Sequence, residues 1–558
     1  MNNKEKFGEI RTPSFCIDMM LEMLPNNVFK ESLTWLDPCA GDGRFYSRIQ
    51  EWILAGKSGG GSSGASSGGG SGGSSGGSSG GSMTSCPTFY VIELNVEHSL
   101  ALMDLQKSAT IPLHLFLCDF LSFHNSISFD IVIGNPPYNS NGLKKVPTNV
   151  NRKKTNDGIT IWPSFIRRSL FVLKDNGLLC MIVPSIWLKP DKAGIYDLMM
   201  QHKLVSLRCF SNSETKSIFK GEAQTPTCIF VLQKRGVGSE GGGGEGGEGG
   251  EGGGGDEGGD EGGGEGGGGG DEGVGCDEGG GGGEGGDEGG GEGNYISFRI
   301  HDDFTQSFFM YRHRIGRPIP MKYPSIVSTF CKYVDEYGSV APFIRKTNMP
   351  KKELLDNGIG VHLYRAVKSC VFIADGTPIL KSDTYFDPMP YQQEEKLILA
   401  HKMYGLPYYD RHGIYGISNR DNYVLLKNDL GGEGEGEVAR SEGEVARSEG
   451  SARSEGEEVA RSEGEEVARS EENIMIKYMH FLSSSIVLFL FDTTRYRMRY
   501  LEKYAFEFIP NIVSYLTLEQ LKDDSFLCRY FDLTPEVTSF ILTRYPRYPK
   551  VFSPQYVM

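Results

Sequence analysis

Cysteine and histidine are scarce in this chain of 558 residues, which contains 11 Cys and 10 His. No two cysteines form a Cys-x-x-Cys pair, and no His and Cys residues cluster at the spacing of metal ligands. These absences argue against a zinc module or a disulfide scaffold, and we expect no metal site. Scattered cysteines are typical of reduced thiols in a cytoplasmic or nuclear protein.

The chain also lacks long apolar runs. Its first six residues are polar, which is unlike a secretory signal peptide. The longest apolar run of the C-terminal half, residues 486–491, is far shorter than the roughly 20 residues that cross a bilayer. We therefore predict no membrane partner.

The chain as a whole has no excess of basic charge, but part of it does. The formal net charge is −15, which at face value argues against a nucleic-acid partner. However, residues 237–293 contain 17 Asp and Glu with no Lys or Arg, and residues 431–472 contain 14 Glu and 5 Arg. The remaining residues therefore carry a net charge of +11, which is compatible with binding a phosphate backbone.

Shifts in composition divide the chain. Residues 58–82 are almost pure Gly and Ser, residues 237–293 are Gly with Asp and Glu, and residues 431–472 repeat near-copies of Val-Ala-Arg-Ser-Glu. Such segments cannot bury a core, so we expect disorder in all three. The predicted folded domains are therefore residues 1–236 and 294–558.

The most informative stretch is Asp-Ile-Val-Ile-Gly-Asn-Pro-Pro-Tyr at residues 130–138. Its apolar, β-branched first half predicts a buried strand. The two prolines cannot continue a sheet, because they lack an N–H and fix φ. Asn135 should therefore lie on a stiff loop just past a strand, where open α/β sheets place their ligands.

This loop suits the methylation of an aromatic amine. The side-chain oxygen of Asn135 and the carbonyl of Pro136 could accept both N–H protons of such an amine and redirect its lone pair. Tyr138 could supply a face on which a planar base stacks. The alternative is an ordinary Pro-rich turn after a strand.

The motif resembles that of the S-adenosylmethionine-dependent amino-methyltransferases, in particular the DNA adenine-N6 methyltransferases that carry Asn-Pro-Pro-Tyr. The resemblance implies an α/β, doubly wound, Rossmann-like sheet. It also implies a catalytic role for four consecutive residues, Asn135, Pro136, Pro137 and Tyr138.

A second motif precedes this one in the chain. Residues 33–36 predict a strand, and Asp37-Pro38-Cys39-Ala40-Gly41-Asp42-Gly43-Arg44-Phe45 follows it. A Gly-x-Gly turn between strand and helix lets the backbone approach a ligand closely. This stretch resembles the cofactor loop of the same methyltransferases, although a plain tight turn is the alternative.

Acidic residues also stand at the ends of the next two predicted strands, Glu93 near the end of residues 89–94 and Asp119 just after residues 113–117. Glu93 could accept hydrogen bonds from the two hydroxyls of a ribose. Asp119 could accept the amino proton of the cofactor's adenine, with Phe120 beside the ring. The alternative for Glu93 is an exposed acid at a strand end.

The family resemblance adds further residues. The Thr12-Pro13 pair would lie over the methionine end of the cofactor. Phe219, on a predicted hairpin near residues 218–222, would face the target base together with Tyr138. Phe219 could instead be an ordinary core residue. The expected cofactor-binding set is Thr12, Pro13, Asp37, Cys39, Ala40, Gly41, Gly43, Glu93, Leu94, Asp119 and Phe120.

Residues 294–558 are rich in aromatic residues and predict a mixed α+β domain. This part resembles, more loosely, the C-terminal recognition domains of type II and phage-type adenine methyltransferases. Arginines at positions 495, 497 and 499 alternate with other residues and fit a nucleic-acid surface, or equally a helix with a solvated basic face.

Taken together, the sequence predicts a site-specific DNA-methyltransferase (adenine-specific, class EC 2.1.1) that uses S-adenosylmethionine and flips its target out of double-stranded DNA. A methyltransferase of RNA or of protein glutamine, and a catalytically silent nucleic-acid-binding protein, are the alternatives. A separate cognate restriction endonuclease, or none, is compatible with the sequence.

Overall fold

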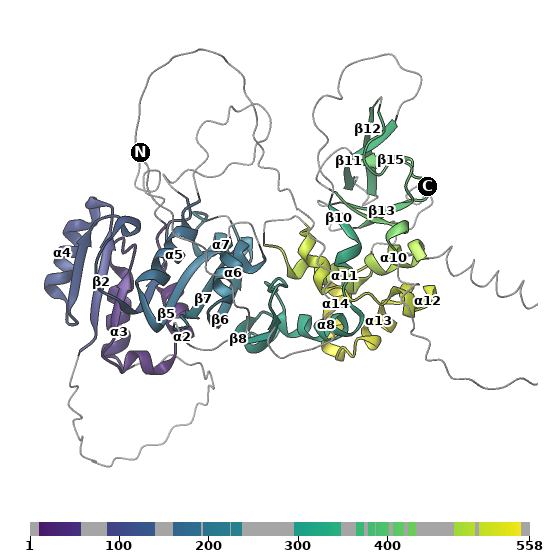
Figure 1. The fold of residues 1–558 in the computed structure, drawn as a ribbon. Coiled ribbons are helices and arrows are strands. Elements are labelled where there is room, and N and C mark those ends of the chain that lie inside the picture. The colour runs from purple at the N-terminus through teal and green to yellow at the C-terminus, as the bar shows by residue number, and fades with distance from the viewer. Residues whose placement is uncertain are drawn as a thin grey trace, which may run out of the picture.

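The computed structural model describes residues 10–56, 86–139, 160–190, 194–223, 225–236, 295–346, 364–372, 378–385, 387–400, 406–417, 422–430, 474–496 and 501–547. The three low-complexity segments for which the sequence predicts disorder lie outside these ranges. Two hydrophobic cores organise the described residues. The first spans Cys16 to Met321 and takes in Tyr496, and the second spans Ile326 to Ile541. Figure 1 shows the corresponding first and second lobes side by side.

The first lobe is built on a nine-stranded sheet of order β3-β2-β1-β4-β5-β7-β6-β8-β9. Strands β1 to β5 pair in parallel, β7 is antiparallel to β5 and β6, and β8 is parallel to β6. The strands are β1 (Thr34–Asp37), β2 (Thr88–Glu93), β3 (Leu113–Leu117), β4 (Phe129–Gly134), β5 (Leu173–Pro184), β6 (Lys203–Phe210), β7 (Thr227–Gln233), β8 (Tyr295–Asp302) and β9 (Ser307–Arg314).

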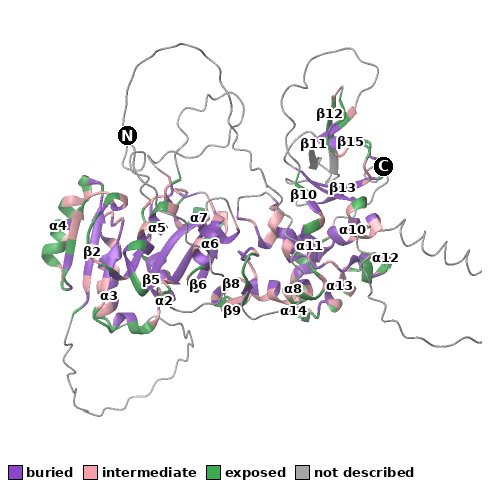
Figure 2. Ribbon diagram, in the orientation of Figure 1, coloured by how far each residue is buried: buried purple, intermediate pink, exposed green. Residues whose placement is uncertain are grey.

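Helices pack on both faces of this sheet, because alternate strand residues point to opposite sides. On β2, Phe89 stacks on Trp35 and meets Tyr46 edge-on, whereas Tyr90 packs against Phe129 on the other face. Central strands are buried on both faces, as Figure 2 shows. The helices of this lobe are α2 (Ser14–Met23), α3 (Arg44–Leu54), α4 (Ser99–Ser108), α5 (Trp162–Val172), α6 (Ile195–Met200) and α7 (Asn212–Ile218), with short 3-10 turns η1 (Asn26–Phe29), η2 (Val96–His98), η3 (Phe120–Ser122) and η5 (Ser185–Leu188).

The predicted fold class is confirmed, and the strands predicted at residues 33–36, 89–94 and 113–117 and just before Asn135 are present as β1, β2, β3 and β4. Two details differ. Strands β8 and β9 follow the acidic segment in sequence, yet they extend the first sheet beyond β6. The stretch before Phe219 is not a hairpin but the helix α7, because Ser211 and Glu214 form a capping box at its start.

The second lobe is mixed α+β, as predicted. It contains a four-stranded antiparallel sheet of order β10-β16-β13-β14 and a three-stranded sheet of order β12-β11-β15. The strands are β10 (Ile344–Lys346), β11 (Tyr364–Phe372), β12 (Pro378–Tyr385), β13 (Lys396–Ala400), β14 (Pro407–Asp410), β15 (Tyr415–Ile417) and β16 (Asn422–Leu426).

Helices make up the remainder of the second lobe. The last one begins after Thr534, whose hydroxyl accepts from the Val537 N–H and caps the helix. The helices and 3-10 turns are α8 (Pro324–Tyr337), η7 (Ala341–Phe343), η9 (Lys427–Asp429), α10 (Ile474–Leu482), α11 (Ser485–Thr493), η10 (Lys503–Phe508), η11 (Val513–Tyr515), α12 (Leu518–Lys522), α13 (Asp524–Tyr530) and α14 (Pro535–Arg544).

Within the described residues, no single helix is long and apolar enough to cross a membrane. The bent pair α10 and α11 reaches that length and composition only when its two helices are taken together.

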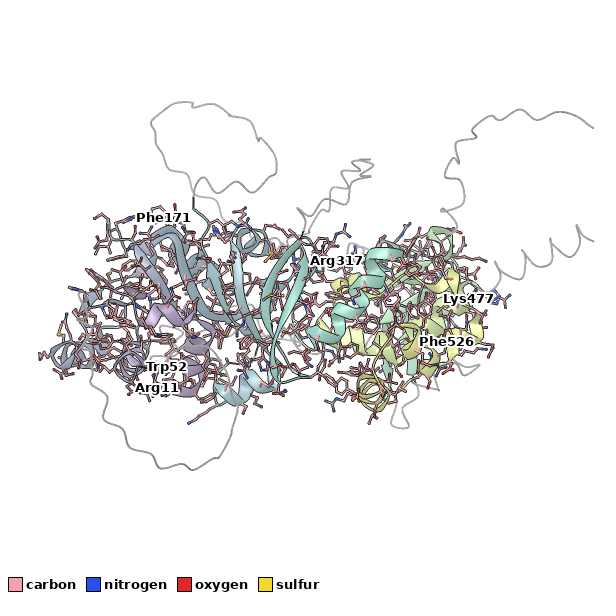
Figure 3. All side chains as sticks on the ribbon, turned by 90° about the horizontal axis from the view of Figure 1, so that it is seen from below. Arg11, Trp52, Phe171, Arg317, Lys477 and Phe526 are labelled. Atoms are coloured by element: carbon pink, nitrogen blue, oxygen red, sulfur yellow. The ribbon has the colours of Figure 1, made fainter. Side chains whose placement is uncertain are left out.

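Direct contacts join the two lobes. The Lys189 ammonium lies 2.7 Å from the Glu502 carboxylate, and the two side chains are 8% and 12% exposed. Tyr504 donates to the Pro190 carbonyl at 2.7 Å, and Tyr496 donates to the Ile319 carbonyl at 2.6 Å. In Figure 3, the labelled Arg317 lies where the lobes meet. These buried polar contacts fix the position of the second lobe against the end of β5.

The Lys189–Glu502 pair yields the first prediction. Glu502→Ala leaves a buried ammonium without its carboxylate, which typically costs about 3–5 kcal/mol. We expect a loss of that order in the free energy of unfolding, measured by urea denaturation. The double variant Lys189→Met, Glu502→Leu is the control and should recover most of it. Equal stability of Glu502→Ala and the native chain would contradict a role for this pair.

Candidate active site

A pocket lies where the strand order reverses, between β1 and β4. The chain runs outward from β1 to β2 and β3, then crosses back to β4 and β5, and open α/β sheets bind ligands beyond the strand ends at such a point. The loops after β1 and β4 approach closely here. A Cβ on Gly134 would lie 3.1 Å from Asp37 Oδ1 and 3.2 Å from Pro38 Cδ, so the approach depends on glycine.

The pocket is open to solvent and is lined by the loops that follow β1, β2, β3 and β4, together with residues 10–12. Most of the residues predicted to bind cofactor or to act in catalysis line it. The lining residues among those predicted are Thr12, Cys39, Ala40, Gly41, Glu93, Leu94, Asp119, Phe120, Asn135, Pro136 and Pro137. Pro13, Asp37, Gly43, Tyr138 and Phe219 are outside the lining.

Glu93 holds the glycine-rich loop in place. Its Oε2 accepts from the Gly41 N–H at 2.6 Å, and its Oε1 accepts from the Asn95 N–H at 2.7 Å. Gly43 has a φ of +79°, a left-handed conformation that favours glycine, and a Cβ there would come within 2.5 Å of the Leu105 side chain.

Asp37 lies behind the wall of the pocket, not in it. Its Oδ1 accepts from the Cys39 N–H at 3.1 Å, and its Oδ2 is buried without a hydrogen-bond partner among the described residues. Burial raises the pKa of this carboxyl to about 8, against the lowering effect of the Cys39 N–H. The Asp37 side chain therefore stabilises the turn of the glycine-rich loop, and its carboxyl is mostly protonated at neutral pH.

Asp119 and Phe120 line the far side of the pocket. The Asp119 carboxylate accepts from the Leu121 N–H and the Ser122 hydroxyl, both at 2.9 Å, which caps η3. Phe120 packs against Phe165 of α5 with ring centroids 5.6 Å apart. The capping bonds fix the direction in which Asp119 presents its remaining lone pairs to the pocket.

Asn135 is held by a segment near the N-terminus. Its Nδ2 donates to Thr12 Oγ1 at 3.0 Å and to the Ile10 carbonyl at 3.3 Å, while its Oδ1 is buried and has no partner among the described residues. A carbonyl can only accept, so the contact with Ile10 determines which end of the amide points toward the N-terminal segment. The acceptor oxygen is therefore the end left available.

Tyr138 and Phe219, predicted to contact a target base, are both in the core. Tyr138 is 8% exposed with its hydroxyl buried and unpartnered within the described part of the chain, and burial raises the pKa of that hydroxyl well above its usual value. Phe219 is 2% exposed at the end of α7. As they lie here, neither ring offers a face to a ligand, and their predicted roles remain predictions.

The sequence interpretation missed a cluster of charges at the pocket. Asp42 lies between two arginines, 2.7 Å from Arg11 and 2.6 Å from Arg44, and Arg44 also donates to the Thr12 carbonyl at 2.8 Å. Hydrogen bonding to Arg44, and then to Arg11, holds the pKa of Asp42 well below its usual value. Asp42 between two glycines and Arg11 before Thr-Pro gave no signal, because the residues are 31 positions apart.

No group of three His, Cys, Asp or Glu that could hold a metal ion is present among the residues that the structure describes.

The raised pKa of Asp37 yields the second prediction. In the unfolded chain this carboxyl ionises near pH 4, whereas in the folded chain it keeps its proton to about pH 8. The unfolded state therefore binds fewer protons between these values, and the free energy of unfolding should fall as pH rises from 4 to 8. Asp37→Asn, which keeps the acceptor for Cys39, should remove this fall in urea titrations at several pH values. Parallel pH profiles for the two proteins would contradict it.

Comparisons with known proteins find methyltransferases. Residues 95–216 match the family model described as Eco57I restriction-modification methylase. The chain is also 34% identical over 86 residues to the Type II methyltransferase M.TthHB8I of Thermus thermophilus, which covers 13% of this chain and 20% of that relative. The chain thus matches about one fifth of the length of this curated relative.

Solved structures with a similar fold include the methyltransferase subunit of a type I restriction-modification system from Streptococcus thermophilus. It shares 20% identity with a TM-score of 0.29, covering 41% of this chain and 46% of that one. The EcoKI M protein, from a type I restriction enzyme, shares 18% identity with a TM-score of 0.27, covering 42% and 45%. Likenesses at this level carry no functional weight by themselves. The matched family model is described as a restriction-modification methylase and the Thermus relative as a type II methyltransferase, which supports the methyltransferase class predicted from the sequence motifs.

Proposed function

We propose that this protein transfers a methyl group from S-adenosylmethionine to the N6 amine of adenine in double-stranded DNA. The observation that carries the proposal is the unpaired, buried Oδ1 of Asn135 in a pocket beyond the ends of β1 and β4. An orphaned buried acceptor is costly unless a donor completes it, and an amino group of a substrate is such a donor.

The residues around the pocket fit the cofactor. Glu93, at the end of β2, would take the ribose hydroxyls, and Asp119 with Phe120, at the end of β3, would take the adenine ring. The glycine-rich loop after β1 would hold the remainder against its backbone. When bound, the cofactor supplies the electrophilic methyl group.

The protein contributes orientation and polarisation. Asn135 Oδ1 would accept one N–H of the target amine, and the Pro136 carbonyl, fixed by its ring and the following proline, would accept the other. Two fixed acceptors hold the amine in line with the methyl group and draw its lone pair out of the ring. A target adenine must leave the duplex to reach this pocket, which costs a few kcal/mol.

Double-stranded DNA is the proposed substrate because the second lobe is large and folded against the first through buried contacts. The matched family model and curated relative, both of restriction-modification systems, support the same choice. A cognate endonuclease encoded on a separate chain is part of this proposal. RNA and protein glutamine are the alternative substrates.

Asn135 provides the direct test of the proposed chemistry. Asn135→Ala removes one oriented acceptor, and by analogy with the loss of one oxyanion-hole donor we expect a rate about 10²–10³ lower. S-adenosylmethionine affinity, measured by calorimetry, should change little. Duplex DNA methylation by purified Asn135→Ala at near-native rates would refute the assignment.

Thr12 tests whether the N-terminal segment orients Asn135. Thr12→Val removes the acceptor at 3.0 Å while keeping the shape, and one hydrogen bond of about 0.5–1.5 kcal/mol corresponds to a two- to tenfold lower kcat. The matched control Thr12→Ser keeps the hydroxyl and should keep the rate. If Thr12→Val instead raises only the KM for the cofactor, Thr12 serves the cofactor and not Asn135.

A further inference from the structure

The acidic segment, residues 237–293, leaves and re-enters the fold at one edge of the first sheet. It follows β7, whose last residues pair Gln233 with Lys203 of β6, and it precedes β8, whose first residue pairs with Arg314 of β9. Strand β7 runs antiparallel to β5, and β8 runs parallel to β6. Both ends of the segment therefore lie at the edge where β1 and β4 begin, opposite the edge that carries Asn135.

Exposed cations surround these two ends. Lys203, Arg235, Arg312 and Arg314 are all exposed, and we call these four residues the cationic rim. Among the described residues, no carboxylate lies within 4.0 Å of Lys203, Arg235 or Arg312.

The rim's remaining contacts leave its charge largely uncompensated. The nearest carboxylate of Arg314, Asp335, is 3.9 Å away and pairs more closely with Arg317, at 2.8 Å. The Arg312 guanidinium lies 4.2 Å from the centroid of the Tyr295 ring, which holds it at the surface beside the point where the acidic segment ends.

We propose that the cationic rim is the docking surface for the acidic segment of the same chain. Residues 237–293 contain 17 Asp and Glu and no Lys or Arg, so every charge that they bring is complementary to the rim. The segment is joined to the rim at both ends, which makes the contact intramolecular and raises its effective concentration. At roughly 3.3–3.6 Å per residue its length does not restrict its reach to these side chains.

The position of the cationic rim favours the acidic segment over DNA as the molecule bound there. Between the rim and Asn135 lies the length of the central strands, about seven residues at roughly 3.3 Å each. An exposed cationic surface on the opposite edge from the pocket would bind DNA without bringing it to the active site. The acidic segment, docked there, shields that surface. The shielding of this surface from DNA rests on the proposed DNA substrate, whereas the docking contact itself does not.

A peptide experiment tests the contact. The full chain is made with residues 237–293 replaced by a neutral Gly/Ser segment of the same length, and a synthetic peptide of residues 237–293 is added at low salt. Surface ion pairs contribute little each, so we expect weak binding that decreases as salt rises. The rim variant Lys203→Glu, Arg235→Glu, Arg312→Glu should bind the peptide about tenfold more weakly, which corresponds to 1.4 kcal/mol.

A matched charge reversal elsewhere on the first lobe serves as the control. Lys30→Glu, Lys216→Glu, Lys220→Glu changes the net charge equally at exposed positions and should leave peptide binding nearly unchanged. Equal loss in both triple variants would show a non-specific charge effect and would overturn the proposal.

Two measurements on the intact chain complete the test. Carbodiimide cross-linking should join Lys203 to acidic residues of 237–293 more often than it joins Lys30, and equal yields would count against docking. DNA methylation should keep its KM in the rim variant. A KM for DNA raised tenfold or more would show that the rim binds the substrate and would overturn the assignment.

Discussion

The candidate site depends on the orientation of the Asn135 side-chain amide, which the Ile10 carbonyl fixes. Asn135 could present either its oxygen or its nitrogen to the pocket, and only the oxygen can accept a proton from an amine. The Ile10 carbonyl accepts from Nδ2 and would repel an oxygen, so the amide is fixed in one orientation. Thr12 adds a second acceptor on the same side. The chemistry of the loop after β4 is thus set by residues more than 120 positions earlier in the chain.

The N-terminal segment is itself held by the cofactor loop. Arg44, at the start of α3, donates to the Thr12 carbonyl, and Arg11 pairs with Asp42 between the two glycines of the loop. A single connected network therefore runs from the glycine-rich turn through residues 10–12 to Asn135.

Local patterns in the sequence predicted what is local in the fold. The strands of the first sheet, the Gly-x-Gly turn, and the polar residues Glu93, Asp119 and Asn135 at strand ends followed from apolar runs and from turn chemistry. The parallel sheet then brought these distant positions together, because carboxyl ends of parallel strands share one edge. The Asp42 cluster and the Ile10 contact could not be predicted in this way, since they depend on pairings across 30 to 125 residues.

Tertiary context adds two features that the sequence interpretation did not include. Residues 295–314 follow a long acidic segment, which suggested a new domain, yet their alternating apolar residues complete the edge of the first sheet next to β6. Tyr138 and Phe219 carry aromatic rings that fit a base in principle, but both pack into the core because burial of a large ring is itself favourable. Composition alone could not distinguish a ring that packs from a ring that binds.

The identity of the methylated atom tests the central claim most directly. The purified chain would be incubated with methyl-labelled S-adenosylmethionine and, separately, with duplex DNA, RNA or protein, and each product would be digested and analysed by mass spectrometry. The account predicts labelled N6-methyladenine from duplex DNA. Label found only in RNA or in protein glutamine, or only on cytosine, would contradict it.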